Sequence, residues 1–133
     1  MKAKITFLFL AACLIFSGAA FSQQLTFCEK LDASGNPVNP GNTFTVNKNG
    51  SPISLCFVAP AGFTGSSVNF DIYRVDDGKE VFHSTMKQPV NSSQKSVVKE
   101  MTFYDAGKFR VYVFDEKDQQ LAKAELTIKR AAK

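Results

Sequence analysis

The sequence predicts an all-β protein in which an antiparallel sandwich of about seven or eight strands follows a cleaved signal peptide. Clusters of turn-forming residues recur about every 8 to 12 residues, which is typical of sandwiches and small barrels. Between these clusters lie short segments in which apolar and polar residues alternate, as expected for strands with one buried face. No segment keeps a helical period for longer than about three turns.

The N-terminal segment has the pattern of a secretory signal peptide. Lys2 and Lys4 precede an apolar run at 5–16, and small residues follow up to Ser22. Small side chains at the positions before the cut are what signal peptidase needs. We therefore expect residues 1–22 to be removed, leaving one domain at 23–133 that is large enough for a single core. The expected location is the periplasm or the extracellular space.

The signal segment also contains a sequence that resembles a lipobox, with Cys13 after a Leu-Ala-Ala triplet. Acylation of Cys13 would make the protein an outer-membrane lipoprotein, which is an alternative to the freely exported form. The apolar run continues through 14–16, where a lipoprotein usually turns polar, and this favours the free form. No later segment is apolar over about 20 residues, so we expect no membrane span.

The strands follow from these patterns in order along the chain. The alternation is clearest at 68–74, where Val68, Phe70 and Ile72 are apolar, and at 108–114. Asn49-Gly50 is a strong hairpin signal between its two neighbouring strands. The predicted strands are 24–30, 43–46, 53–58, 68–74, 80–85, 96–103, 108–114 and 121–129.

The segment 105–111 resembles the Asp-x-Gly-x-Tyr-x-Cys corner between strands E and F of immunoglobulin domains. Gly107 can adopt the backbone conformation that such a corner needs. The chain departs from the family at Phe109, which lacks the tyrosine hydroxyl, and at Val111, which stands where the second cysteine would be. It also has no Trp, so Phe70 is expected to replace the tryptophan of strand C. The resemblance implies an immunoglobulin-like sandwich, while other antiparallel sandwiches and small barrels remain open.

Two cysteines, Cys28 and Cys56, remain after the predicted cleavage. An even pair in a small exported domain predicts one disulfide, which stabilises by about 3 to 4 kcal/mol in the chain-entropy model. Phe27, Leu55 and Phe57 have the phase of the buried face, so both cysteines fall on the opposite face. We expect a bridge on the outer face or at an edge, where it ties down the first strand. In immunoglobulin domains the bridge instead joins strands B and F.

The sequence carries no recognisable catalytic or cofactor motif. His83 is the only histidine and has no nucleophile motif beside it, so we expect it to face solvent. The acidic loops at 76–77 and 115–118 would supply Ca²⁺ ligands only if both lay at one end of the fold. We expect no metal, no cofactor and no enzymatic activity. The formal charge of +4 is scattered along the chain, which gives little support for nucleic-acid binding.

An aromatic surface is the best candidate for a binding site. If the strands at 68–74, 108–114 and 121–129 are neighbours, Tyr73, Tyr112 and Phe114 share one outer face, with Arg110 and Lys123 on its rim. Aromatic and arginine side chains are enriched in protein interfaces. The expected function is a non-enzymatic binding or structural module of the bacterial cell envelope that acts on a protein partner through a sheet face or edge strand. The alternatives are a carbohydrate-binding module that uses exposed aromatics, which the absence of Trp disfavours, and a small hydrolase.

Overall fold

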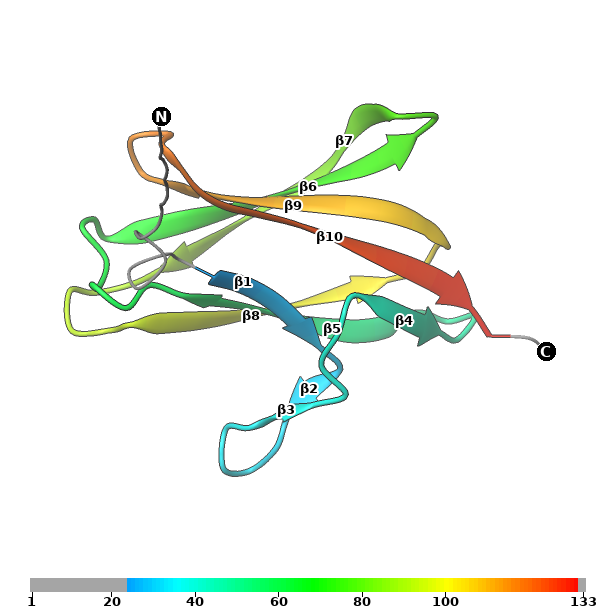
Figure 1. Cartoon of the computed structure of the whole chain (residues 1–133), viewed down its shortest axis with the longest axis horizontal. Helices are drawn as coiled ribbons and strands as arrows, with labels where there is room; N and C mark the ends of the chain where they lie inside the picture. The colour runs from blue at the N-terminus through cyan, green and yellow to red at the C-terminus, as the bar shows by residue number, and fades with distance from the viewer. Residues whose placement is uncertain (1–23, 132–133) are drawn as a thin grey trace, which may run out of the picture.

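The computed structural model describes residues 24–131, and the described chain is entirely β (Figure 1). The predicted signal peptide, Cys13 and the last two residues lie outside the described residues. Two of the ten strands found between residues 24 and 131 form only a small hairpin, β2–β3. The strands are β1 Gln24–Cys28, β2 Lys30–Leu31, β3 Pro37–Val38, β4 Thr43–Val46, β5 Ser51–Val58, β6 Ser67–Asp76, β7 Lys79–Pro89, β8 Ser96–Phe103, β9 Gly107–Asp115 and β10 Gln120–Arg130.

Two sheets face one another and enclose the core. The smaller sheet has the order β1-β5-β8 and the larger has the order β4-β10-β9-β6-β7. All neighbouring pairs are antiparallel except β4 and β10, which run parallel. In Figure 1 the larger sheet lies above the smaller one, and the β2–β3 hairpin projects below it. The predicted all-β class is confirmed.

The core contains side chains that sequence alternation assigned to the buried face, together with residues of β4 and β8 for which no phase was predicted. On β6, Phe70 and Ile72 are fully buried, and the apolar residues of β9 and β10 meet those of β5 from the other sheet. Phe70 occupies the core position predicted for it. Truncating one such Phe to Ala costs about 3 to 5 kcal/mol. The core members contributed by strands are Phe27, Phe44, Val46, Ile53, Leu55, Phe57, Val68, Phe70, Ile72, Val97, Phe103, Phe109, Val111, Val113, Leu126 and Ile128.

The hairpin predicted at Asn49-Gly50 is wrong. β4 pairs with β10 and β5 pairs with β1 and β8, so the turn carries the chain from one sheet to the other. Gly50 has φ +90° and its N–H bonds the carbonyl of Asn47, as a tight turn requires. Phe44 and Val46 are both buried, and they cover the core from the larger sheet. A local turn signal cannot distinguish a hairpin from a crossing between sheets, because both need the same tight bend.

The predicted corner at 105–111 is tied down by an arginine from β6. Gly107 opens β9 with φ +148°, a conformation that residues with a side chain rarely adopt. Arg74 donates from Nη2 to the carbonyl of Ala106 at 2.9 Å, and its guanidinium carbon lies 5.6 Å from the centre of the Phe109 ring. The contact to the corner backbone is thus made by Arg74, since Phe109 has no hydroxyl.

Candidate functional site

Four aromatic rings form a continuous cluster on the outer face of the larger sheet. Tyr73 lies edge-on to Tyr112 with 5.5 Å between ring centres, and Tyr112 stacks on Phe114 at 6.0 Å. Phe82 on edge strand β7 extends the cluster, with its ring 5.7 Å from that of Tyr73. We call Tyr73, Phe82, Tyr112 and Phe114 the aromatic face. The structure thus brings together the three rings that alternation assigned to this surface.

Phe82 is a member that the sequence reasoning missed. It is 57% exposed and lies opposite Tyr73 across the β6–β7 pair. The register of this pair shifts between Ile72 and Tyr73, because β7 carries one extra residue, His83. The bulge inverts the alternation of β7, so the phase of one half of the strand does not predict the phase of the other. The available signal was an aromatic side chain within a predicted strand.

Arg110 is not a free cation on the rim, as the sequence suggested, but the centre of an ion-pair network. Its guanidinium lies 2.6 Å from a Glu80 carboxylate oxygen and 2.9 Å from one of Glu125. The Tyr112 hydroxyl donates to the same Glu80 oxygen. Lys123 does border the aromatic face, with its ammonium nitrogen 5.9 Å from the Tyr112 ring centre. The network fixes Tyr112 in place and joins strands β7, β9 and β10 across the surface.

The network shifts the pKa of each of its members. The hydrogen bond from Tyr112, then that from Arg110, lowers the pKa of Glu80 below its usual value. The Arg110 hydrogen bond likewise lowers the pKa of Glu125. The bonds to Glu125 and Glu80 raise the pKa of Arg110, and the bond to Glu80 raises that of Tyr112. At neutral pH the surface therefore holds two carboxylates, one guanidinium and a protonated phenol.

The cysteine pair lies on the outer face of the smaller sheet, as predicted. Cys28 stands opposite Ser54 and Cys56 opposite Thr26, so the cysteines are diagonal neighbours on paired strands. Their sulfurs are 3.9 Å apart and both are free thiols, so the predicted disulfide is not formed in this structure. Burial, followed by the neighbouring Cys28, raises the pKa of the Cys56 thiol to about 12. The Cys56 thiol is therefore protonated at neutral pH and a poor nucleophile in this form.

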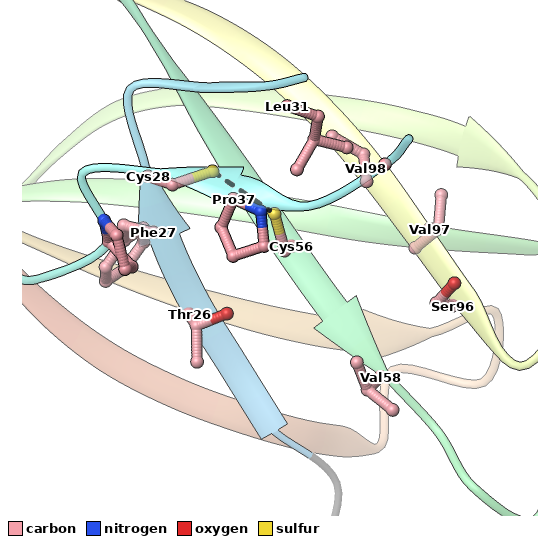
Figure 2. A pocket seen from close by; sticks show the side chains of 12 residues that line it. Thr26, Phe27, Cys28, Leu31, Pro37, Cys56, Val58, Ser96, Val97 and Val98 are labelled. Atoms are coloured by element: carbon pink, nitrogen blue, oxygen red, sulfur yellow. Dashed lines mark hydrogen bonds between the residues drawn. The ribbon is translucent and has the colours of Figure 1, made fainter. Parts of the chain in front are cut away.

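The β2–β3 hairpin folds over the cysteine pair. Figure 2 shows Pro37 of β3 beside Cys56, and Leu31 of β2 beside Val98 of β8. Together they enclose a mostly apolar pocket of about 400 Å³ above the sheet. The hairpin leaves Cys28 only 1% exposed. The hairpin thus covers the part of this outer face around the cysteines, whereas Val58 and Val98 stay 37% and 40% exposed beside it.

The acidic loops lie at opposite ends of β6. Asp76 lies at the hairpin turn opposite Lys79, whereas Asp115 lies opposite Val68 at the other end of the strand. Asp115 accepts the backbone N–H groups of residues 117 and 119. Within residues 24–131 no group of three or more His, Cys, Asp or Glu side chains is arranged to hold a metal. The condition under which these loops would bind Ca²⁺ is therefore not met.

His83 faces solvent, as expected for a strand histidine without a catalytic partner. One ring nitrogen, Nδ1, lies 3.2 Å from the Ser84 hydroxyl oxygen. The imidazole is edge-on to Phe109, with 5.5 Å between ring centres. These contacts explain its orientation, which follows from its place in the β7 bulge.

Neither a protein-family model nor a curated protein matches this sequence. In the part of the chain that the structure describes, no helix has the length and apolar character to cross a membrane. The outer surfaces of the two sheets are therefore the candidate binding sites.

Proposed function

We propose that this chain is an exported, non-enzymatic binding module of the bacterial cell envelope, which holds a protein partner against its aromatic face. The observation that carries the proposal is the aromatic cluster itself. Its rings touch one another across three strands, and Phe82 remains 57% exposed. Contiguous exposed apolar surface on a small domain usually marks an interaction site. Aromatic anchors surrounded by polar groups are the arrangement that protein interfaces favour.

The proposal includes an immunoglobulin-like sandwich as the scaffold. Its support is the strand order, in which β5 pairs with β8 in one sheet, and β9 lies between β6 and β10 in the other. Strands B and E of the family, and strands C, F and G, have these neighbours. In this correspondence β9 is strand F, and it begins at the Gly107 corner. Val111, at the position of the family's second cysteine, is fully buried.

A protein partner fits the geometry of the rings better than a sugar does. Sugar recognition by aromatics uses ring faces that are open to a flat ligand. Here only Tyr112 and Phe114 are nearly parallel, at 21°, while Tyr73 stands edge-on to both Phe82 and Tyr112, at 79° and 89°, so the four rings do not share one platform. The charged network beside them offers orientation to a polar partner surface. Glycan binding is the alternative outcome of the experiment described below.

Export is supported by the cysteine pair. Sulfurs 3.9 Å apart on paired strands need only a small approach to bond. We propose that a disulfide-bearing oxidase of the envelope forms the bridge. Each thiol loses one proton, an S–S bond forms, and the two electrons reduce the disulfide of the oxidase to two thiols.

The test compares the double variant Tyr112→Ser/Phe114→Ser with Tyr104→Ser in capture of envelope proteins, followed by titration of the purified partner. Tyr104 is a tyrosine in the β8–β9 loop away from the aromatic face and, at 58%, is more exposed than Tyr112 and Phe114. The double variant should bind about 5 to 30 times more weakly per anchor lost, and the Tyr104 control should bind normally. Circular dichroism and thermal unfolding report whether each variant is folded.

Equal binding by the double variant and the wild type would exclude this face. If the wild type binds glycans on an array and the double variant does not, the ligand of this face is a sugar and not a protein.

A further inference from the structure

The second surface that lacks a neighbour is the free edge of β7. This strand ends the larger sheet, and its only partner in the described chain is β6. It is among the two longest strands, at 11 residues, and Val81 and Phe82 are 52% and 57% exposed. A long edge with apolar side chains pairs readily with another strand. We infer that β7 pairs antiparallel with β7 of a second copy of this chain, so that two larger sheets join into one.

The backbone of β7 selects one register for this pairing. Residues in an antiparallel ladder alternate between pairs that exchange hydrogen bonds and pairs that do not. On β6, every second residue has the same backbone orientation, as do Val75, Tyr73, Asp71 and Asn69. Their partners on β7 therefore also share one backbone orientation. Those partners are Glu80, Phe82, Thr85 and Lys87. Because of the extra residue at His83, the first two partners have even numbers and the last two have odd numbers. All four nevertheless keep the same backbone orientation.

A two-fold axis between His83 and Ser84 matches this pattern along the whole strand. It sets Glu80 opposite Lys87 of the second copy and Phe82 opposite Thr85, so residues of equal backbone orientation meet. Val81 opposite Met86 and Lys79 opposite Gln88 also lie on one face, and His83 and Ser84 meet at the axis itself. Without the bulge the same register would pair residues from opposite faces of the sheet. Edge bulges often discourage pairing, but this one makes the strand self-complementary.

The side chains in this register are complementary in charge and polarity. Glu80 and Lys87 of the other copy are directly opposite in this register, and the two-fold symmetry produces this pair of opposite charges twice. Within one chain the Glu80 carboxylate points toward Arg110 and Tyr112 on β9, so the Lys87 ammonium of the other copy approaches it from the free edge. Glu80 already accepts bonds from Arg110 and Tyr112, which keep it ionised. The exposed Phe82 ring lies over Thr85, whose hydroxyl donates to Asp71 on the same surface. The pairing thus covers the most exposed part of the aromatic face and leaves Tyr112 and Phe114 accessible.

The dimer has a consequence for binding. The two aromatic faces lie on the same side of the joined sheet, so the dimer presents two copies of the site to a partner. The inference itself does not rest on the proposed function, because it depends on β7 alone. The contact through two strands is small, and it belongs with weak, concentration-dependent interfaces.

The first experiment is sedimentation equilibrium of the protein purified after export, over about 10 µM to about 1 mM. The wild type should shift from one to two chains. Lys87→Glu places two carboxylates opposite one another at both symmetric ends, and should raise the dimer dissociation constant about tenfold or more. Lys48→Glu, in the exposed β4–β5 turn, is the matched control for charge and should leave it unchanged. A monomer throughout this range, or equal effects of the two variants, would overturn the inference.

A mixing experiment tests the register. Glu80→Lys and Lys87→Glu should each dimerise weakly alone, while an equimolar mixture restores a heterodimer with both charge pairs intact. Thermal unfolding checks that Glu80→Lys remains folded without its bonds to Arg110 and Tyr112.

Amide hydrogen exchange on the unmodified protein gives an answer that needs no variant. Peptides from β7 should gain protection with rising concentration, whereas those from the edge strand β8 should not. Concentration-dependent protection at β8 in place of β7 would contradict this interface.

Discussion

The outer faces of the two sheets differ in what covers them. On the smaller sheet the chain's own β2–β3 hairpin folds over the apolar residues, and Cys28 is 1% exposed. On the larger sheet the aromatic face has charged neighbours around it, and Phe82 remains 57% exposed. Both faces carry apolar side chains at the outward positions of alternating strands. The hairpin contact therefore adds to the stability of the domain, whereas the aromatic face is the surface that we propose for a second molecule.

The largest expected effect concerns the covered face. Formation of the Cys28–Cys56 bridge after export should stabilise the domain by about 3 to 4 kcal/mol. The intact mass of the exported protein should be two hydrogens lower than that of the reduced chain. Reduction, or Cys28→Ser/Cys56→Ser, should lower the free energy of unfolding by that amount in urea titrations. Two alkylatable thiols in protein recovered from the periplasm would contradict the bridge.

The next largest effect concerns the corner at Gly107, where β9 begins. Gly107→Val should destabilise the domain by about 1 to 3 kcal/mol, because Gly107 has φ +148° and a new Cβ would lie 2.9 Å from the Arg74 guanidinium. The measurement is thermal unfolding. Lys117→Ala, in the turn after β9, serves as the comparison and should stay within about 0.5 kcal/mol of wild type. Similar melting shifts in both variants would mean that the corner is not strained.

A smaller effect compares the two faces directly. Leu31→Ser removes an apolar contact that the hairpin makes with the sheet, and should cost about 1 kcal/mol of stability. Phe82→Ser, on the open face, should cost about half of that or less because the ring is mostly solvated in the folded protein. Urea titration of both variants at low protein concentration, where the chain is monomeric, measures the difference. A reversed order would mean that the aromatic face, not the hairpin, stabilises the domain.

The smallest effect is the pH dependence of the charged network. Glu80 and Glu125 have pKa values below the usual 4.5 in the folded state, so their contribution is complete above that pH. It is lost as the pH falls through their folded pKa values, since protonation then favours the unfolded chain. Unfolding midpoints measured from about pH 5 to about pH 3 should decline, and Arg110→Met should flatten the decline. An unchanged slope in Arg110→Met would show that the ion pairs contribute nothing measurable.

Much of the fold was predictable because alternation is a local property. The buried phase of β6, β9 and β10 followed from Phe70, Val111 and Leu126 and their neighbours at every second position. The same reasoning assigned Tyr73 and Tyr112 to one outer surface. Local signals failed where pairing decided the outcome: Asn49-Gly50 joins two sheets instead of two paired strands.

The candidate site was predictable only in part, for a related reason. Arg110 was expected at a rim, yet it lies between Glu80 and Glu125, which come from two strands, β7 and β10, that are not consecutive in the sequence. Asp115 was considered only as a Ca²⁺ ligand, but its carboxylate accepts two backbone N–H groups and the residue is buried. Such contacts depend on which strands become neighbours, and the local sequence of one strand does not specify its neighbours.

The sequence by itself determined that this chain is all-β, which residues form its core and on which face the cysteines lie, because each follows from the two-residue period of a strand. Only the tertiary structure decided that β4 leaves its sequence neighbour to run parallel with β10, and that the β2–β3 hairpin covers the cysteines. It also decided that a single extra residue at His83 turns Phe82 onto the aromatic face. Sheet order and register are set by how the core is filled from both sides at once, and no local stretch of sequence contains that information.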